Sequence, residues 1–367
     1  MHAKLTHMRI VIAPDSFKTS ASAHDVAHHI ATGIREVLSN DTEIILHPMS
    51  DGGEGTSALF AGERITLPTT DALGRITEAT YTYDARNEIA YIDVAAASGL
   101  KEVGDHLSPL TADTFGTGAL IADAASRGAK RLILGLGGSA TTDGGTGILT
   151  ALGANFLDAN GHSLPPGGAA LKRLASVDIS RLNLQAAAMD MLMLADVVTP
   201  ATGPDGTSAV YAPRKGASAE DVNELEAGIS QLCKVLNVNP EIPGMGAAGG
   251  VPICLTWIST TLHGGTDNIR LVPGARVIVD VTGLKDEIAD ADVVITGEGC
   301  YDSDTDMGKV VSVVLGLNPQ AKQFVVAGRI DGPLPEGVRG ITLINSNDVK
   351  KQLVRAGNKI AEQLIRD

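Results

Sequence analysis

Five segments of this chain carry carboxylate and hydroxyl side chains, and four of them combine these with glycine, a combination suited to binding phosphate groups. In the richest of them an apolar run, Leu132–Leu134, leads into the loop GLGGSATTDGG at residues 135–145. Glycines lack a Cβ atom, so successive N–H groups can turn toward an anion, and a helix that follows directs its positive end the same way. This loop therefore predicts a phosphate-binding site. The other four segments are PDSFKTS (14–20), SDGGEG (50–55), ADVVTPATGPDG (195–206) and GEGCYDSDTDMGK (297–309).

Each segment follows an apolar run typical of a strand, and open α/β sheets bind their ligands just beyond such strands. Phosphoryl transfer needs backbone donors around phosphate groups, carboxylates for Mg²⁺ and for the proton of the attacking hydroxyl, and a cation near the γ-phosphate. These segments supply all of these groups. The sequence contains neither the P-loop pattern G-x-x-x-x-G-K-[ST] nor the HRD and DFG motifs of protein kinases. We therefore expect phosphoryl transfer on another framework.

A second interpretation of the same loop is a dinucleotide-binding site. Gly135, Gly137 and Ala140 satisfy G-x-G-x-x-A after a strand, and Asp158 lies near the distance expected of a ribose-binding acid. An NAD(P)-dependent oxidoreductase of a small hydroxy acid therefore stays open on spacing alone. Against it, residues 141–147 contain β-branched residues and glycines where the first turn of a Rossmann helix belongs.

Composition limits the class of protein and its partners. The chain has 367 residues, 44% hydrophobic content and 42 glycines, which suits a globular α/β enzyme of more than one domain. A net charge of −14 argues against a nucleic-acid partner. Three cysteines without metal-type spacing indicate a reducing compartment, and the sequence contains no apolar run of signal or membrane length. We expect a cytoplasmic protein without a membrane partner; the sequence leaves the oligomeric state open.

The order of predicted elements indicates two α/β domains. Strand, loop and helix alternate near both ends of the chain, whereas residues 63–97 alternate apolar and polar side chains as antiparallel strands do. Toward the C-terminus, residues 275–283, 291–299 and 322–330 each read as a strand. We predict a doubly wound, mostly parallel, Rossmann-like domain from residues 1–75 and 270–367. The inserted domain, 76–269, then carries the antiparallel strands and the glycine-rich loop.

The chain resembles the bacterial-type glycerate kinases over nearly its whole length, from Met8 to the C-terminal helix. The resemblance rests on many short motifs that occur in the family's order. These are IVIAPDSFK at 10–18, DGGEG at 51–55, AAASGL at 95–100, TFGTGALI at 114–121, GLGGSATTDGGTG at 135–147, GPDGTSAVYAPRKGA at 203–217, PGMGAAGG at 243–250 and ADVVITGEG at 291–299.

The resemblance implies ATP-dependent phosphorylation of glycerate with Mg²⁺, on a two-domain α/β fold with the site in the cleft between the domains. Carried over position by position, it gives candidates that we group by expected role. The catalytic candidates are Asp196, Lys18 and Asp15; those for nucleotide and phosphate are Gly137, Gly138, Ser139, Thr142 and Asp143; those for substrate are Ser16, Asp51, Gly52, Gly53 and Glu54; and those for Mg²⁺ are Glu298 and Asp51.

The roles within these groups are inferred from chemistry. We expect the Gly137–Ser139 backbone to bind phosphate, Lys18 to neutralise charge and Asp196 to accept the proton of the glycerate hydroxyl. Asp51, Asp143 or Glu298 would then be available for Mg²⁺. Plain structural roles remain possible for several of these residues. Asp15 and Asp143 would cap helices, Lys18 would be a solvated lysine and Glu298 a turn residue.

Two segments depart from the family pattern. CDV-x-NPL-x-G of the family reads ADVVTPATG at 195–203, and GEGR-x-D-x-Q reads GEGCYDSD at 297–304, which replaces an arginine by Cys300. Losing an arginine removes a bidentate partner for carboxylate or phosphate. These departures suggest a third interpretation, a catalytically impaired homologue that still binds ligand.

Overall fold

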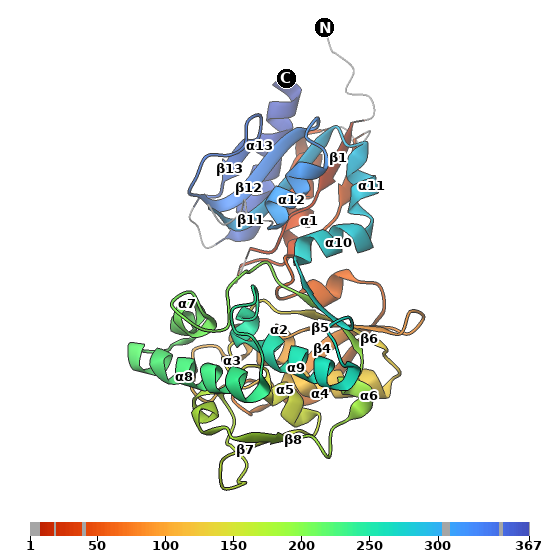
Figure 1. Ribbon diagram of the computed structural model, residues 1–367. Helices are drawn as coiled ribbons and strands as arrows, with labels where there is room; N and C mark the ends of the chain where they lie inside the picture. Colours follow the sequence, from red (N-terminus) through yellow and green to blue (C-terminus); the bar gives the residue numbers. More distant parts are fainter. Residues whose placement is uncertain (1–7, 18–19, 39–41, 303–308, 345–347, 367) are drawn as a thin grey trace. The chain divides into compact units, whose positions relative to one another are not determined.

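A computed structural model describes residues 8–17, 20–38, 42–302, 309–344 and 348–366 (Figure 1). The chain has an α/β fold and divides into two compact units. Unit 1 comprises Met1–Asp51 and Pro273–Asp367, and unit 2 comprises Gly52–Val272. In the part of the chain that the structure describes, no helix is long and apolar enough to cross a membrane.

Unit 1 is built on a parallel sheet with the strand order β13-β12-β11-β1-β2. Residues of β12 alternate between the two faces: Phe324 and Val326 pack with one set of helices, and Val325 and Ala327 with another. Burial on both faces explains the nearly continuous apolar sequences of β1 and β11. The strands are β1 (Arg9–Ile12), β2 (Glu43–Leu46), β11 (Val293–Tyr301), β12 (Lys322–Ile330) and β13 (Arg339–Thr342).

Helices cover both faces of this sheet (Figure 1). On one face α1 packs against α13. Ser22 caps α1, because its side chain accepts a hydrogen bond from the Asp25 N–H at 3.1 Å. Residues 275–283 were predicted as a strand, but 275–282 lie in the helix α10, which ends before Gly283. Ala275, Ile278 and Val279 are buried in α10. The helices are α1 (Ala23–Val37), α10 (Gly274–Thr282), α11 (Leu284–Ala289), α12 (Val310–Leu317) and α13 (Val349–Arg366).

The close approach of α1 and α13 depends on glycine. A Cβ atom added to Gly357 would lie 2.1 Å from the Ile30 carbonyl oxygen, a backbone atom that has little room to move. We therefore expect Gly357→Ala to lower the free energy of unfolding by about 1–3 kcal/mol in urea titrations followed by circular dichroism. Gly316→Ala in α12 is the control, because nothing lies within 4 Å of its added Cβ. It should raise stability by about 0.5–1 kcal/mol; equal effects at both positions would contradict the packing argument.

Unit 2 is built on a mixed sheet with the order β10-β9-β6-β5-β4-β3. The neighbours from β5 to β10 pair in parallel, and β3 and β4 join them antiparallel. Because β3 pairs along its whole length with β4, residues 52–75 belong to this unit, and the boundary predicted near residue 75 lies instead after Asp51. The strands are β3 (Glu63–Thr70), β4 (Ile76–Asp84), β5 (Ile89–Asp93), β6 (Arg131–Gly135), β9 (Asp190–Leu194) and β10 (Ile269–Val272), with a separate pair β7 (Asn155–Leu157) and β8 (Ser176–Asp178).

The helices of unit 2 share one large apolar core with this sheet. The core includes buried residues of α4, α8 and α9, such as Leu120, Leu232 and Ile258. The α-helices are α2 (Ala95–Ser98), α3 (Leu100–Val103), α4 (Phe115–Ser126), α5 (Thr146–Ala151), α6 (Leu184–Ala187), α7 (Thr207–Tyr211), α8 (Ala219–Leu236) and α9 (Val251–His263). Short 3₁₀ helices are η1 (Thr56–Leu59), η2 (Gly168–Arg173), η3 (Ala212–Lys215) and η4 (Ala247–Gly249).

Candidate functional site

The glycine loop leaves the carboxyl end of β6, in the middle of the parallel part of the sheet in unit 2. It runs against the DGGEG segment: the Gly137 N–H donates to the Gly52 carbonyl oxygen at 3.1 Å. A Cβ atom on Gly137 would lie 2.6 Å from the Cα atom of Gly53, so only glycine permits this approach. The structure therefore brings together two segments that the sequence singled out separately, including Gly52, Gly53 and the neighbouring Glu54.

The centre of the loop presents two adjacent backbone donors. Gly138 has a left-handed backbone, with φ of 81°, and is exposed. Its carbonyl oxygen accepts a hydrogen bond from the Leu100 N–H at 3.0 Å, and the Ala140 N–H donates to the Ser98 carbonyl oxygen at 2.8 Å. Within the described residues, the N–H groups of Gly138 and Ser139 have no hydrogen-bond partner. Successive unpaired N–H groups next to a left-handed residue are the geometry of an anion-binding nest.

Asp143 organises the loop from inside. Its side chain is fully buried and accepts four hydrogen bonds: from the Thr114 N–H and hydroxyl at 3.0 and 2.8 Å, and from the Gly145 and Gly147 N–H groups at 3.1 and 3.0 Å. It thus ties the loop to the starts of α4 and α5, which is the helix-capping role that the sequence left open. These four hydrogen bonds favour a structural role for Asp143, and Mg²⁺ binding by its carboxylate stays a prediction.

A buried lysine that sequence reasoning missed lies beneath the loop. Lys215, at the end of η3, is 5% exposed, and its Nζ donates to the Ser139 Oγ at 3.1 Å and to the Thr141 carbonyl oxygen at 2.5 Å. Burial lowers the pKa of this ammonium group to about 7, although the charge of Asp143 opposes the shift. A single lysine in PRKG reads as a solvated side chain, so no local signal distinguished it.

A second missed residue, Asp93, holds the DGGEG segment in place. Asp93 ends β5 beside Gly135 of β6, and its carboxylate accepts hydrogen bonds from the Gly55 N–H at 3.1 Å and from the Ser57 N–H and hydroxyl at 2.9 Å each. Burial raises the pKa of the Asp93 carboxyl to about 6, while hydrogen bonds from Ser57 and Gly55 oppose the shift.

The raised pKa of Asp93 predicts a pH-dependent contribution to stability. Between the ordinary pKa of 3.8 and about 6, the folded protein holds the proton more tightly than the unfolded chain, so the contribution of Asp93 to stability falls as pH rises through this window. Relative to wild type, Asp93→Asn should therefore become more stable from pH 4 to pH 6.5, by up to about 3 kcal/mol. Urea unfolding at several pH values measures the difference, and a flat one would contradict the shift.

Asp196 follows β9, the strand next to β6. The register pairs Leu194 with Gly135, and the Leu136 N–H donates to the Leu194 carbonyl oxygen at 3.1 Å. Asp196 is partly buried two residues further on, at the same edge of the sheet as the glycine loop. Thr142, also in the loop, is fully buried, and its hydroxyl has no hydrogen-bond partner within the described chain.

The remaining candidates belong to unit 1. Asp15 follows the carboxyl end of β1, where its N–H donates to the Gly297 carbonyl oxygen of the neighbouring parallel strand β11 at 2.8 Å. Glu298 lies within β11, in register with Ala327 of β12, and is therefore not a turn residue. Asp15 is buried, and its carboxylate accepts a hydrogen bond from the Ser16 N–H at 2.6 Å. Asp51 ends the first segment of this unit and is partly buried. Lys18 lies outside the described residues.

The family pattern has an arginine at the position of Cys300, and in this chain another arginine lies beside Cys300. Cys300 pairs with Arg329 in the register of β11 and β12, and the Arg329 guanidinium donates to the Cys300 Sγ at 3.4 Å. Arg329 also forms an ion pair with Asp331 at 2.6 Å. A guanidinium group is therefore present at this part of the sheet, but it comes from Arg329 of the adjacent strand β12.

The geometry does not support the dinucleotide interpretation. α5 begins only at Thr146, so five residues separate Ala140 of the fingerprint from the helix that should start there. Asp158 follows β7, which pairs with β8 in a separate two-stranded sheet, and its carboxylate accepts hydrogen bonds from the Asn160 and His162 N–H groups at 2.8 and 3.0 Å. Asp158 is thus a turn residue.

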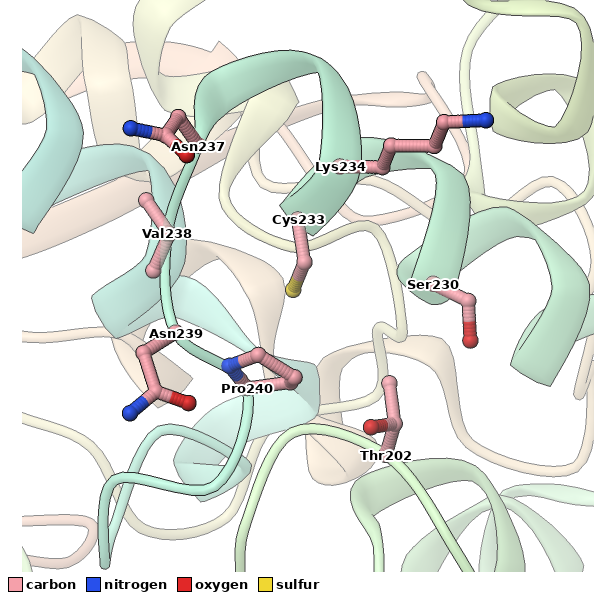
Figure 2. A pocket seen from close by; sticks show the side chains of 8 residues that line it. All are labelled: Thr202, Ser230, Cys233, Lys234, Asn237, Val238, Asn239 and Pro240. Atoms are coloured by element: carbon pink, nitrogen blue, oxygen red, sulfur yellow. The ribbon is translucent and has the colours of Figure 1, made fainter.

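A pocket of about 460 Å³ lies elsewhere in unit 2, around the end of α8 (Figure 2). Figure 2 shows Cys233 reaching into the space near Thr202 and Pro240, while Lys234 extends away from it. Burial raises the pKa of the Cys233 thiol to about 11, so this thiol is protonated at neutral pH. None of the expected site residues lines this pocket.

The described residues offer few side chains that could bind a metal ion together. Among the described residues, no group of three or more His, Cys, Asp or Glu side chains is arranged to hold a metal ion. Mg²⁺ commonly uses one or two carboxylates and completes its shell with phosphate oxygens and water. Partly buried carboxylates such as Glu298 and Asp51 fit that donor set.

Comparison with known proteins gives one consistent family. The model of the Glycerate kinase family matches residues 10–365. A curated glycerate kinase of Halalkalibacterium halodurans is 36% identical over 90% of this chain and 87% of its own length. The glycerate 2-kinase of Escherichia coli is 38% identical over 86% of this chain and 83% of its own length. A crystal structure from Salmonella typhimurium LT2 that carries the assignment glycerate kinase 2 is 35% identical, covers 98% of both chains and has a TM-score of 0.79.

Proposed function

We propose that this chain, which belongs to the glycerate kinase family, transfers the γ-phosphoryl group of ATP to a hydroxyl group of glycerate with Mg²⁺. The observation that carries the proposal is the glycine loop, where two unpaired N–H groups at Gly138 and Ser139 lie beside the ammonium-bearing side chain of Lys215. Phosphate is the ligand that such a set of donors fits best. The full-length family match makes ATP and glycerate the substrates to test first.

Each expected residue has a role in this proposal. The backbone from Gly137 to Ser139 binds nucleotide phosphate, with the Thr142 hydroxyl as a further donor and Asp143 holding the loop in shape. Asp196, at the same sheet edge as the loop, accepts the proton of the attacking hydroxyl. Charge neutralisation by Lys18 and a supporting role for Asp15 complete the catalytic set.

Substrate and metal are assigned to the segments near Asp15 and Asp51. Glu298 and Asp51 would hold Mg²⁺, which would supply positive charge to neutralise the phosphate groups of ATP. The residues assigned to glycerate are Ser16, Asp51, Gly52, Gly53 and Glu54. Gly52 and Gly53 support this assignment because they lie directly against the glycine loop, so a ligand held by them is adjacent to bound phosphate.

One assay tests the proposal. The purified protein is incubated with ATP, Mg²⁺ and D-glycerate, ADP is followed, and ³¹P NMR identifies the phosphorylated product and the position of its phosphate. Reactions without glycerate, or with lactate, which lacks the second hydroxyl, are the controls. Glycerate-dependent ADP formation supports the kinase. Stabilisation by ATP and glycerate without turnover would show an impaired homologue, and reduction of NAD(P)⁺ by a hydroxy acid would overturn the proposal. Because ATP is supplied inside the cell, we place the reaction in the cytoplasm.

A further inference from the structure

We propose that Lys215 supplies the positive charge for nucleotide phosphates bound at the glycine loop, and that its amine takes up a proton when they bind. The inference rests on the proposed kinase function. Lys215 reaches the loop from η3, more than 70 residues away in the chain, and its hydrogen bonds to Ser139 Oγ and the Thr141 carbonyl oxygen place Nζ at the anion-binding nest.

The hydrogen bonds of Lys215 leave capacity for an anion. An ammonium group has three N–H donors, and the two contacts of Nζ account for two of them. The Ser139 hydroxyl accepts from Nζ and can therefore direct its own proton toward a ligand. Next to it, the N–H groups of Gly138 and Ser139 have no partner within the described residues. Amine, hydroxyl and backbone N–H groups thus form one continuous donor set.

Buried hydroxyls nearby add to this polar region. The Thr141 and Thr142 hydroxyls in the loop are fully buried and have no hydrogen-bond partner in the described part of the chain. The same is true of Thr207 and Ser208 in α7, the helix that leads into η3. Unpaired buried polar groups are rare in folded proteins because each costs about 1–3 kcal/mol. Their concentration on the segments around Lys215 favours a bound polar ligand.

Few charges compensate Lys215 in the free protein. Asp143 is the charged group that acts on its amine, but the Asp143 carboxylate is already hydrogen-bonded to Thr114, Gly145 and Gly147. The carboxyl of Asp113, which acts on Asp143, has its pKa raised to about 6 by burial and by that neighbour.

The helices around η3 do not pair with the amine. The helix α8 also packs against η3, and the carboxylate of its Glu226 accepts a hydrogen bond from the Gly203 N–H at 2.7 Å. The helix α7 contributes the hydroxyl groups of Thr207 and Ser208, which are neutral.

This environment couples the charge of Lys215 to its ligand. Burial lowers the pKa of the amine to about 7, so in the free protein much of it is neutral just above neutral pH. Polyphosphate binding beside Nζ favours the charged form and raises the pKa. Binding must therefore take up a proton wherever the pH lies above the pKa of the free protein. Uptake approaches about one proton per ATP at pH 8 and falls toward zero at pH 6.

Isothermal titration calorimetry of MgATP in the absence of glycerate measures this uptake, using two buffers of different ionisation enthalpy at each pH. We expect uptake by wild type at pH 8, and no uptake by Lys215→Met, which keeps the length of the side chain without its charge. The variant should also bind MgATP roughly 10- to 100-fold more weakly at pH 6. Lys234→Met is the matched control, since Lys234 is an exposed lysine of the same unit, and it should behave as wild type.

The outcomes separate the two proposals. MgATP binding by wild type without proton uptake at pH 8 would overturn the role of Lys215 and leave the kinase function standing; this measurement needs no variant, so misfolding of Lys215→Met does not affect it. Absence of MgATP binding by wild type would overturn the kinase function, and the role of Lys215 with it. Uptake that persists in a folded Lys215→Met would also overturn the inference, because another group would then be the one that titrates.

Discussion

Asp196→Asn should lower kcat for glycerate phosphorylation by roughly 10²- to 10⁴-fold while the Kd for MgATP stays within about twofold of wild type. The proposed base must remove the proton of the glycerate hydroxyl, and an amide cannot accept it. Asp196 follows β9, whose Leu194 is in register with Gly135 at the start of the glycine loop. Asp196 therefore lies at the sheet edge where the glycine loop begins. Steady-state kinetics and calorimetric titration measure the two quantities.

The control for Asp196 is a carboxylate at the other end of the same strand. Asp190 begins β9, and its side chain accepts a hydrogen bond from the Asn268 side-chain amide at 2.6 Å. Asp190→Asn keeps an acceptor there and should leave kcat unchanged. If Asp196→Asn retained a near-normal kcat, or if both variants lost activity equally, Asp196 would not be the base.

Asp143→Ala should lower the free energy of unfolding of unit 2 by at least about 3 kcal/mol and abolish measurable MgATP binding. The substitution removes the acceptor of four buried hydrogen bonds and leaves donors of Thr114, Gly145 and Gly147 unsatisfied. It also frees the loop that presents the Gly138 and Ser139 N–H groups. Urea unfolding followed by fluorescence reports on this unit, because the only tryptophan of the chain, Trp257, lies in α9.

Asp158→Ala is the comparison for this prediction. Asp158 also accepts hydrogen bonds from backbone N–H groups, but it does so in a surface turn, where water replaces the lost acceptor. We expect a loss of no more than about 1 kcal/mol and normal MgATP binding. A urea midpoint of Asp143→Ala as high as that of Asp158→Ala would show that the buried carboxylate does not organise the loop.

Local sequence predicted the loop but not the residues that support it. Glycines and hydroxyls between a strand and a helix indicate an anion site because the relevant donors are on neighbouring residues. The sequence did not indicate Lys215 or Asp93, because the residues that they form hydrogen bonds with are far away in the chain. Ser139 is 76 residues from Lys215, and Ser57 is 36 residues from Asp93. Nothing in PRKG or YIDV distinguishes a buried charge from a solvated one until the fold removes it from water.

The fold shows the same division between local and distant information. The buried strands β1, β11 and β12 and the amphipathic helices α1, α8 and α13 follow from local periodicity. Residues 275–283 were placed in a strand because a short run of valine and isoleucine suits either a strand or a buried helix. Packing within unit 1 selects the helix α10, in which Ala275, Ile278 and Val279 are all buried.

By itself, the sequence determined the α/β class, the family, the glycine loop and the identity of the groups available for phosphoryl transfer, because these depend on residue type and short spacing. Only the tertiary structure decided that β3 belongs to the same unit as β4, that the Asp143 carboxylate holds the loop through buried hydrogen bonds, and that Lys215 contacts the loop. These outcomes depend on which distant segments meet and on how completely they exclude water. The free energy that an ionic interaction or a hydrogen bond contributes in a protein depends on that burial.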